Sequence, residues 1–139
     1  MSVNLIIGGS GFIGQHLIQA LATHYINLDI IKTENNYQYS NVKNPIDIKL
    51  DEKIDIIYNL AAIHTTPGHK YHEYFETNIK GAENICNFAR KENINSIVLT
   101  SSIAPYGTWE EAKTEKSLPV PTSAYGSSKL VAEEIHKRW

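Results

Sequence analysis

Cysteine is scarce in this sequence: Cys86 is the only one among 139 residues, so no internal disulfide can form. Cys86 lies in an apolar helical stripe, which predicts a packed thiol rather than a nucleophile. The sequence also lacks a large excess of charge of one sign: it contains 13 Lys and Arg residues and 15 Asp and Glu residues, which gives a net charge of −2. This balance offers no electrostatic basis for binding nucleic acid or an anionic membrane. Any bound anion must therefore be held by local geometry.

Long hydrophobic runs are missing as well. No window approaches the ~20 apolar residues that a membrane span needs. Residues 1–4 carry no basic side chain, and Gly8 and Gly9 interrupt the apolar run that follows, so no signal peptide is predicted. The resulting prediction is a cytoplasmic protein. Its 42% hydrophobic content is ordinary for one globular domain.

What the sequence does contain is an alternation of strand-like and helix-like patterns. Short apolar runs predict buried strands at residues 3–7, 26–30, 54–62 and 97–100, and a possible short strand at 45–48. The polar, asparagine-rich residues 33–44 and the proline-containing residues 105–122 predict loops.

Helical spacing fills the remaining segments. Ile13, Leu17 and Leu21 recur every four residues and predict a helix after the first strand. A long helix is predicted from about residue 69 to 92, and a last helix begins near Ser123, with Val131, Ile135 and Trp139 four apart along it. The alternation predicts an α/β fold, a Rossmann-like doubly wound parallel sheet with strand order 3-2-1-4-5.

A glycine-rich turn links the first strand to the first helix. Gly8, Gly11 and Gly14 are spaced by three, and the helix begins near Phe12. Glycine permits a tight turn and a close backbone approach to a pyrophosphate, toward which the helix N-terminus directs free N–H groups. Strand, glycine turn and helix in this order favour a dinucleotide site over a simple turn.

Three further side chains suit hydride-transfer chemistry. Tyr125 and Lys129 are four residues apart on the last helix and share one face. A neighbouring ammonium favours the phenolate form of tyrosine, which can then act as a base. Ser102 follows the strand at 97–100, at the sheet edge where ligands bind in open parallel sheets. Turn chemistry alone could also explain a serine at this position.

Five short motifs occur in order along the chain: Gly8 to Gly14, Leu60-Ala61-Ala62, Asn78-Ile79-Lys80-Gly81, Thr100-Ser101-Ser102 through Tyr106-Gly107, and Tyr125 to Lys129. This order resembles that of the extended short-chain dehydrogenase/reductase family. The chain resembles its NAD-dependent epimerase/dehydratase type, in particular nucleotide-sugar enzymes like UDP-glucose 4-epimerase.

The resemblance implies a role for each matching position. Tyr125 corresponds to the general acid/base, Lys129 to the residue that lowers the tyrosine pKa and holds the nicotinamide ribose, and Ser102 to the serine that hydrogen-bonds the reacting oxygen. Cofactor contacts are implied for Gly8, Gly11, Phe12, Ile13, Gly14, Asp47, Ile48, Leu60, Ala61, Ala62 and Asn78, besides Tyr125 and Lys129.

Two departures affect the expected chemistry. Family members that prefer NAD carry an acidic residue at the end of the second strand, where Lys32 falls if that strand runs through Ile31. The cofactor is therefore expected to be NAD or NADP, with Lys32 leaning weakly toward NADP. Ile103 and Ala104 follow Ser102 where 4,6-dehydratases carry an Asp-Glu pair, so epimerisation or keto reduction is expected rather than dehydration.

The length is the largest departure, because family members are roughly twice as long. Residues 1–139 are therefore expected to form an incomplete NAD(P)-binding domain that lacks the C-terminal substrate domain, to bind dinucleotide weakly and to turn over no sugar by themselves. The alternatives are a non-catalytic NAD(P)-binding module and an inactive fragment. Expected partners are a nucleotide sugar and a second copy of the chain, through the helices at 70–92 and 123–139. No metal is expected at His64, His69 and His72, because no fourth ligand has suitable spacing.

Overall fold

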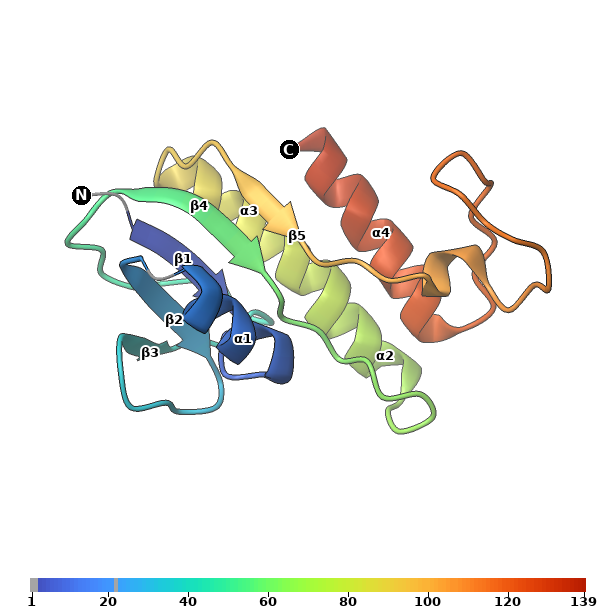
Figure 1. Cartoon of the computed structure of the whole chain (residues 1–139), viewed down its shortest axis with the longest axis horizontal. Coiled ribbons are helices and arrows are strands. Elements are labelled where there is room, and N and C mark those ends of the chain that lie inside the picture. The colour runs from blue at the N-terminus through green and yellow to red at the C-terminus, as the bar shows by residue number, and fades with distance from the viewer. Residues whose placement is uncertain (1–2, 22) are drawn as a thin grey trace.

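A five-stranded parallel sheet forms the centre of the computed structural model, which describes residues 3–21 and 23–139 (Figure 1). The strands lie in the order β3-β2-β1-β4-β5. Their bounds are β1 Val3–Ile7, β2 Tyr25–Asp29, β3 Tyr37–Tyr39, β4 Ile54–Asn59 and β5 Ile97–Leu99. All four pairings between neighbours are parallel. The predicted fold class and strand order are confirmed.

Helices lie on both faces of the sheet. Helix α1 covers one face at the glycine turn, and a continuous helical run covers the other (Figure 1). This run joins α2, the π-helical segment η1 and α3, and α4 lies beside it, while the short 3-10 helix η2 precedes α4. The helical bounds are α1 Phe12–Leu21, α2 Tyr71–Tyr74, η1 Phe75–Lys80, α3 Gly81–Lys91, η2 Ala104–Tyr106 and α4 Ala124–Arg138. None of these helices of the described chain is long and apolar enough to cross a membrane.

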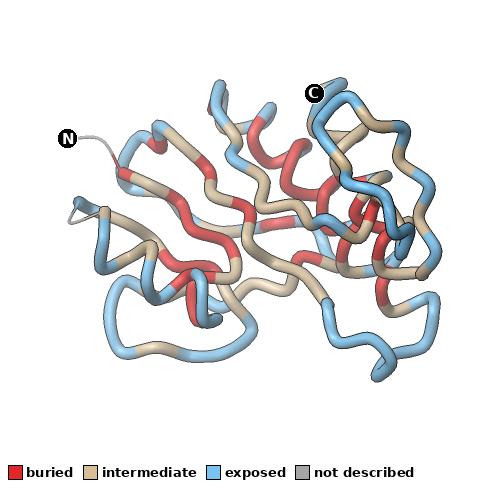
Figure 2. Tube along the Cα trace, turned by 45° about the vertical axis from the view of Figure 1, so that its right-hand side comes forward, coloured by how far each residue is buried: buried red, intermediate tan, exposed pale blue. Residues whose placement is uncertain are grey.

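Most of the hydrophobic core lies between the sheet and α3. Leu5 of β1, Leu28 of β2 and Ile57 of β4 are fully buried and belong to one cluster with Ile85 and Phe88 of α3. Burying each such side chain stabilises the fold by about 1.5–3 kcal/mol. Helix α1 contributes less, since Gly14 is its one buried residue. The buried trace is accordingly concentrated along the central strands and the α3 side (Figure 2).

The third strand is not where the sequence predicted it. Residues 45–48 form no strand, and β3 lies within the predicted loop at 33–44. Tyr37 and Tyr39 are aromatic residues that suit a strand, and they pair with β2 despite the asparagines before them. Pro45 has no N–H to donate to a neighbouring strand, which disfavours a strand here, and Ile46 belongs to the core from a loop.

The second strand also ends earlier than predicted. Strand β2 stops at Asp29, and Ile30 and Ile31 beyond it are 59% and 61% exposed. The alternation of apolar residues over 26–30 therefore extended the predicted strand past its true end. Asp29, not Lys32, is the residue at the carboxyl end of β2.

The last helix begins as predicted but buries another face. The Ser123 side chain accepts a hydrogen bond from the Gly126 N–H, which confirms Ser123 as the N-cap. The buried positions of α4 include Lys129 and Ala132, whereas Val131 of the predicted apolar face is exposed.

Candidate active site

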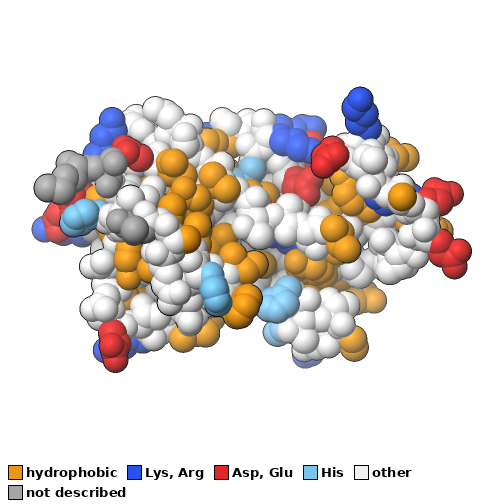
Figure 3. Space-filling view, in the orientation of Figure 1, with side chains coloured by type: hydrophobic (Ala, Val, Ile, Leu, Met, Phe, Trp, Pro, Cys, Tyr) orange, Lys and Arg blue, Asp and Glu red, His pale blue; other side chains and the backbone are white. Residues whose placement is uncertain are grey.

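A cleft of about 730 Å³ opens at the carboxyl ends of the strands. Its size suits a small molecule or cofactor. Hydrophobic side chains are exposed in the middle of the face seen in Figure 3. Two of the cleft residues, Phe12 and Ile13, are 81% and 55% exposed. Ten of the predicted site residues line the cleft: Gly8, Gly11, Phe12, Ile13, Gly14, Leu60, Ala61, Ala62, Tyr125 and Lys129. Lys32, Asp47, Ile48, Asn78 and Ser102 are not part of this lining.

The glycine loop is packed closely against its surroundings. Gly8 has a φ of +87°, and a Cβ there would lie 2.7 Å from the Ala61 nitrogen. A Cβ on Gly14 would lie 2.5 Å from the Cα of Gly9. These two glycines therefore bring the start of α1 against the ends of β1 and β4.

Gly11 has a different environment, which tests whether the loop fits a pyrophosphate. The nearest atom to a Cβ built on Gly11 is the Gly8 carbonyl oxygen at 3.5 Å, so the space in front of this residue is open. The first turn of α1 follows, and its N–H groups have no partner within the helix. Backbone donors beside an open approach fit a phosphate group.

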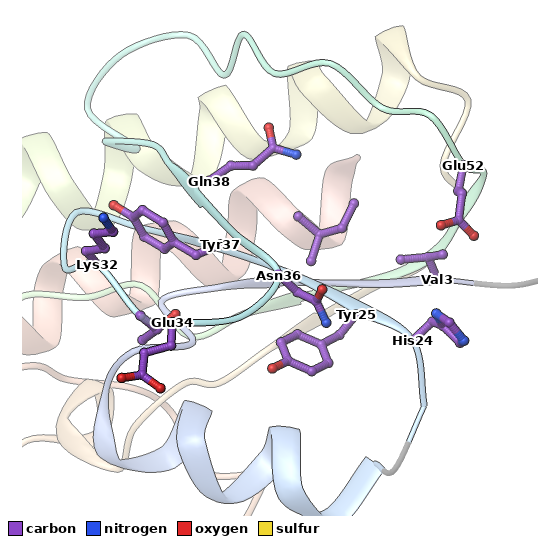
Figure 4. A pocket seen from close by; sticks show the side chains of 11 residues that line it. Val3, His24, Tyr25, Lys32, Glu34, Asn36, Tyr37, Gln38 and Glu52 are labelled. Atoms are coloured by element: carbon purple, nitrogen blue, oxygen red, sulfur yellow. The ribbon is translucent and has the colours of Figure 1, made fainter.

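Asp29 is a cleft residue that the sequence analysis assigned no role. Its carboxylate accepts the Ser10 N–H at 2.9 Å and the Ile31 N–H at 3.0 Å. Lys32 instead lines a separate polar pocket of about 410 Å³, where it lies with Glu34 and Tyr37 (Figure 4). The spacing could have identified Asp29, because it lies 21 positions after Gly8 and the ribose-binding acid of Rossmann folds follows the glycine motif by ≈ 20 residues.

The two residues expected near the adenine, Asp47 and Ile48, do not line the cleft. Asp47 is exposed and Ile48 packs against the core. Asn41 and Val42, which follow β3, line the cleft instead. A correct end for β3 would have indicated this pair, since ligands gather at the carboxyl ends of parallel strands.

Tyr125 and Lys129 of α4 face the same cleft as the glycine loop. Lys129 is only 3% exposed, and its Nζ donates a hydrogen bond of 2.7 Å to the Thr100 carbonyl oxygen. Burial lowers the pKa of Lys129, while the carboxylate of Glu133 opposes this shift. Glu133 also accepts a hydrogen bond from Ser101. The end of β5 and helix α4 are thereby joined around the lysine.

Ser102 lies on the turn next to this cluster. Its Oγ accepts the Ala104 N–H at 3.1 Å, which is the turn bond expected of a serine after a strand. A hydroxyl that accepts one bond can still donate its own hydrogen. The Ser102 hydroxyl can therefore still donate a hydrogen bond.

Asn78 does not line the cleft; it connects two neighbouring segments by hydrogen bonds. It is 4% exposed and lies in η1. Its amide bonds the Ile63 N–H at 3.0 Å, the Ile63 carbonyl at 3.1 Å and the Ser128 Oγ at 2.9 Å. These bonds tie the loop after β4 to α4, and η1 presents Thr77 to the cleft. Apolar spacing could not reveal the π turn that produces this arrangement.

No metal site is formed by the described part of the chain, since nowhere do three His, Cys, Asp or Glu side chains come together as ligands. Of the three histidines considered, His69 lies near a carboxylate, with its Nδ1 3.7 Å from Glu73 Oε2.

Comparison with known proteins agrees with this geometry. The profile of the NAD dependent epimerase/dehydratase family matches residues 4–139. An N-acetyl-alpha-D-glucosaminyl-diphospho-ditrans,octacis-undecaprenol 4-epimerase of Escherichia coli O157:H7 is 28% identical over 97% of this chain and 43% of its own length. A UDP-glucose 4-epimerase of Lactobacillus helveticus is 26% identical over 94% of this chain and 45% of its own length.

Solved structures give the same result. A UDP-glucuronic acid 4-epimerase from Bacillus cereus in complex with NAD has a TM-score of 0.82 at 28% identity, covering 99% of this chain and 52% of that one. The chain thus spans about half the length of the relatives it matches. It belongs to the NAD-dependent epimerase/dehydratase family.

Proposed function

We propose that residues 1–139 are an NAD-binding domain carrying the catalytic groups of an epimerase or keto-reductase that acts on a nucleotide-linked sugar. One observation carries the proposal: Tyr125 and Lys129 line the same cleft as the glycine loop and Asp29. The activity is proposed for the whole protein that contains these residues.

The cofactor would lie across the carboxyl ends of the strands. The open approach at Gly11 and the N-terminus of α1 suit the pyrophosphate. Asp29 suits the hydroxyls of the adenine ribose, and Asn41 and Val42 lie where the adenine would follow. Asp29 supports NAD over NADP, because a carboxylate repels a 2′-phosphate, and Lys32 lines a different pocket.

When bound, NAD supplies the group that accepts and returns a hydride. Tyr125, as phenolate, would take the proton of the sugar hydroxyl while that carbon is oxidised to a ketone, and would return the proton on reduction. The ammonium of Lys129 has three donors, of which Thr100 takes one, so two remain for Tyr125 and a ribose hydroxyl. Ser102 would donate its hydrogen to the reacting oxygen.

A second copy of the chain is the proposed protein partner. Tyr71 and Phe75 are 75% and 40% exposed on the α2–η1 run, and Val131 of the adjacent α4 is 40% exposed. Aromatic surface of this kind is enriched at protein interfaces.

The cofactor assignment is tested by calorimetric titration with NAD. Gly11→Val places a side chain in the open approach and should weaken NAD binding at least tenfold without lowering the urea midpoint. Lys32→Ala should bind NAD as wild type does. Unchanged binding by Gly11→Val would contradict the proposed pyrophosphate site.

The catalytic assignment is tested in the protein that contains these residues. Tyr125→Phe should lower kcat for UDP-hexose interconversion or reduction by about 10²–10⁴-fold and keep NAD affinity. Tyr39→Phe, a tyrosine outside the cleft lining, is the control. NAD binding without turnover of any nucleotide sugar would favour a non-catalytic binding module instead.

A further inference from the structure

Ser10 belongs to the glycine loop, yet its polar groups bond the segment around the end of β2. It is only 8% exposed. Its N–H donates to Asp29 Oδ2 at 2.9 Å, and its Oγ donates to the Ile31 carbonyl oxygen at 2.7 Å. The same Oγ accepts a hydrogen bond of 3.0 Å from Asn27 Nδ2. A single residue therefore ties the phosphate loop to three residues of the neighbouring strand and turn.

These bonds fix the Asp29 carboxylate from two sides. Ser10 holds one carboxylate oxygen directly, and Ile31 donates its N–H to the other oxygen at 3.0 Å. Because Ser10 also holds the carbonyl of Ile31, it restrains the turn that supplies this second bond.

Asn27, the hydrogen-bond partner of Ser10 Oγ, is itself held rigidly. It is 1% exposed, and its Nδ2 also donates to Thr33 Oγ1 at 3.1 Å. Its Oδ1 lies so close to the loop that a Cβ on Gly9 would be 2.4 Å away. The enclosed Asn27 side chain cannot shift without moving the glycine loop, so Ser10 has a fixed hydrogen-bond partner in Asn27.

We propose that Ser10 is a positioning residue: it holds the Asp29 carboxylate where the hydroxyls of an adenine ribose reach it, and so contributes to selection of NAD over NADP. This inference rests on the NAD binding proposed above. A carboxylate has about four acceptor positions, so two N–H bonds leave two for the ribose hydroxyls. A carboxylate held in this orientation also stays close to the position of a 2′-phosphate, which carries close to two negative charges, and therefore repels NADP.

A double-mutant cycle tests the proposal on the chain. NAD and NADP affinities are measured by calorimetry for the wild type, Ser10→Ala, Asp29→Asn and the double variant. Ser10→Ala keeps the backbone N–H bond to Asp29 and removes the Oγ bond that restrains the Ile31 turn. Loss of one well-formed hydrogen bond corresponds to about a tenfold change, so Ser10→Ala should weaken NAD binding by about tenfold and NADP binding by less than about twofold.

The decisive result is the coupling between the two sites. If Ser10 acts through Asp29, the double variant should bind NAD no more weakly than Asp29→Asn. Additive losses, or a Ser10→Ala variant with wild-type NAD affinity and NAD:NADP ratio, would overturn the inference.

Thr33→Val is the matched control, because it removes the other partner of Asn27 Nδ2 without touching Asp29. It should keep NAD affinity within about twofold. If Ser10→Ala does not fold, the same cycle is carried out with Ser10→Cys, whose thiol is a weak donor of similar size. Failure of the wild type to bind NAD would refute the proposed function together with this inference, whereas NAD binding unaffected at Ser10 would refute the inference alone.

Discussion

The charge of Glu133 acts on the buried Lys129 without a direct salt bridge between them and opposes the effect of burial on the lysine pKa. Lys129 is buried, Glu133 has a 26% exposed side chain, and Glu133 also receives the Ser101 hydroxyl. Removing a partner of a buried charge leaves that charge uncompensated, which is costly. The stability of α4 against β5 should therefore depend on the charge of Glu133.

We expect Glu133→Gln to lower the free energy of unfolding by about 1–3 kcal/mol. Glutamine can still accept from Ser101, so the loss reports the charge of Glu133, which acts on Lys129 and lies 3.9 Å from the Lys137 ammonium. Urea unfolding at neutral pH measures it. Glu134→Gln is the control, since Glu134 contacts Lys137 at the surface and its substitution should leave the midpoint unchanged. Equal midpoints for the two variants would show that Glu133 does not compensate Lys129.

His136 should make stability depend on pH. Burial lowers its pKa, the Ala132 carbonyl opposes this shift, and the charge of Lys129 adds to it. The folded state therefore resists protonation of His136, while the unfolded chain takes up the proton near pH 6.5. Stability is then full above that pH and decreases as the pH falls through it toward the lower folded-state pKa.

The expected outcome is a smaller loss of stability between pH 7 and 5.5 for His136→Gln than for the wild type, measured by urea unfolding. His72→Gln, a substitution on the exposed surface of α2, should retain the wild-type slope. A wild-type slope in His136→Gln would assign the pH dependence to other groups.

At the level of the elements, η1 connects the cleft to the last helix. Asn78 uses its amide to join the loop after β4 to Ser128 of α4. We expect Asn78→Ala to reduce the free energy of unfolding by about 2–4 kcal/mol, because several buried groups lose their partners. Chemical denaturation checks this value. Asn87→Ala on the exposed side of α3 should change it by less than about 0.5 kcal/mol, and a similarly small effect at Asn78 would contradict the connecting role.

The sequence predicted some elements well because their patterns are long and repetitive. The strand–glycine–helix start gave correct element types, and the apolar stripe from Phe75 to Ala89 correctly indicated a helical segment, although residues 75–80 are π-helical. Strand β3 has only three residues, and it follows asparagines that favour turns, so tertiary pairing rather than local pattern creates it. Because of that one error, Asp47 and Ile48, which do not line the cleft, were predicted in place of Asn41 and Val42, which do.

Side-chain networks were the least predictable part of the site. The Tyr125–Lys129 spacing identified two cleft residues directly, since positions four apart share a helix face. The roles of Ser10, Asp29 and Glu133 depend on contacts between segments that are distant in sequence. Strand ends and loop register set these contacts, and neither follows from periodicity.

For the whole molecule, association is the property to test. The proposed interface combines Tyr71 and Phe75 with Val131, exposed residues on neighbouring helices. We expect wild-type dimers in sedimentation equilibrium and at least a tenfold weaker association for Phe75→Glu. Ile103→Glu, at an 85% exposed position before η2, should associate like the wild type. A wild type that stays monomeric at high concentration would contradict the interface.

Helix α4 has a consequence for how this protein can evolve. The same 15 residues carry the Tyr125–Lys129 pair, bury Ala132 and bring His136 within hydrogen-bond distance of Asn59 in β4. A mutation that loosens this packing also displaces the Tyr125–Lys129 pair. Selection therefore cannot change the packing of α4 without also affecting the position of the two site residues. Tolerance to substitution should therefore be narrow along the inward side of α4 and wide along its outward side, a profile that a deep mutational scan would reveal.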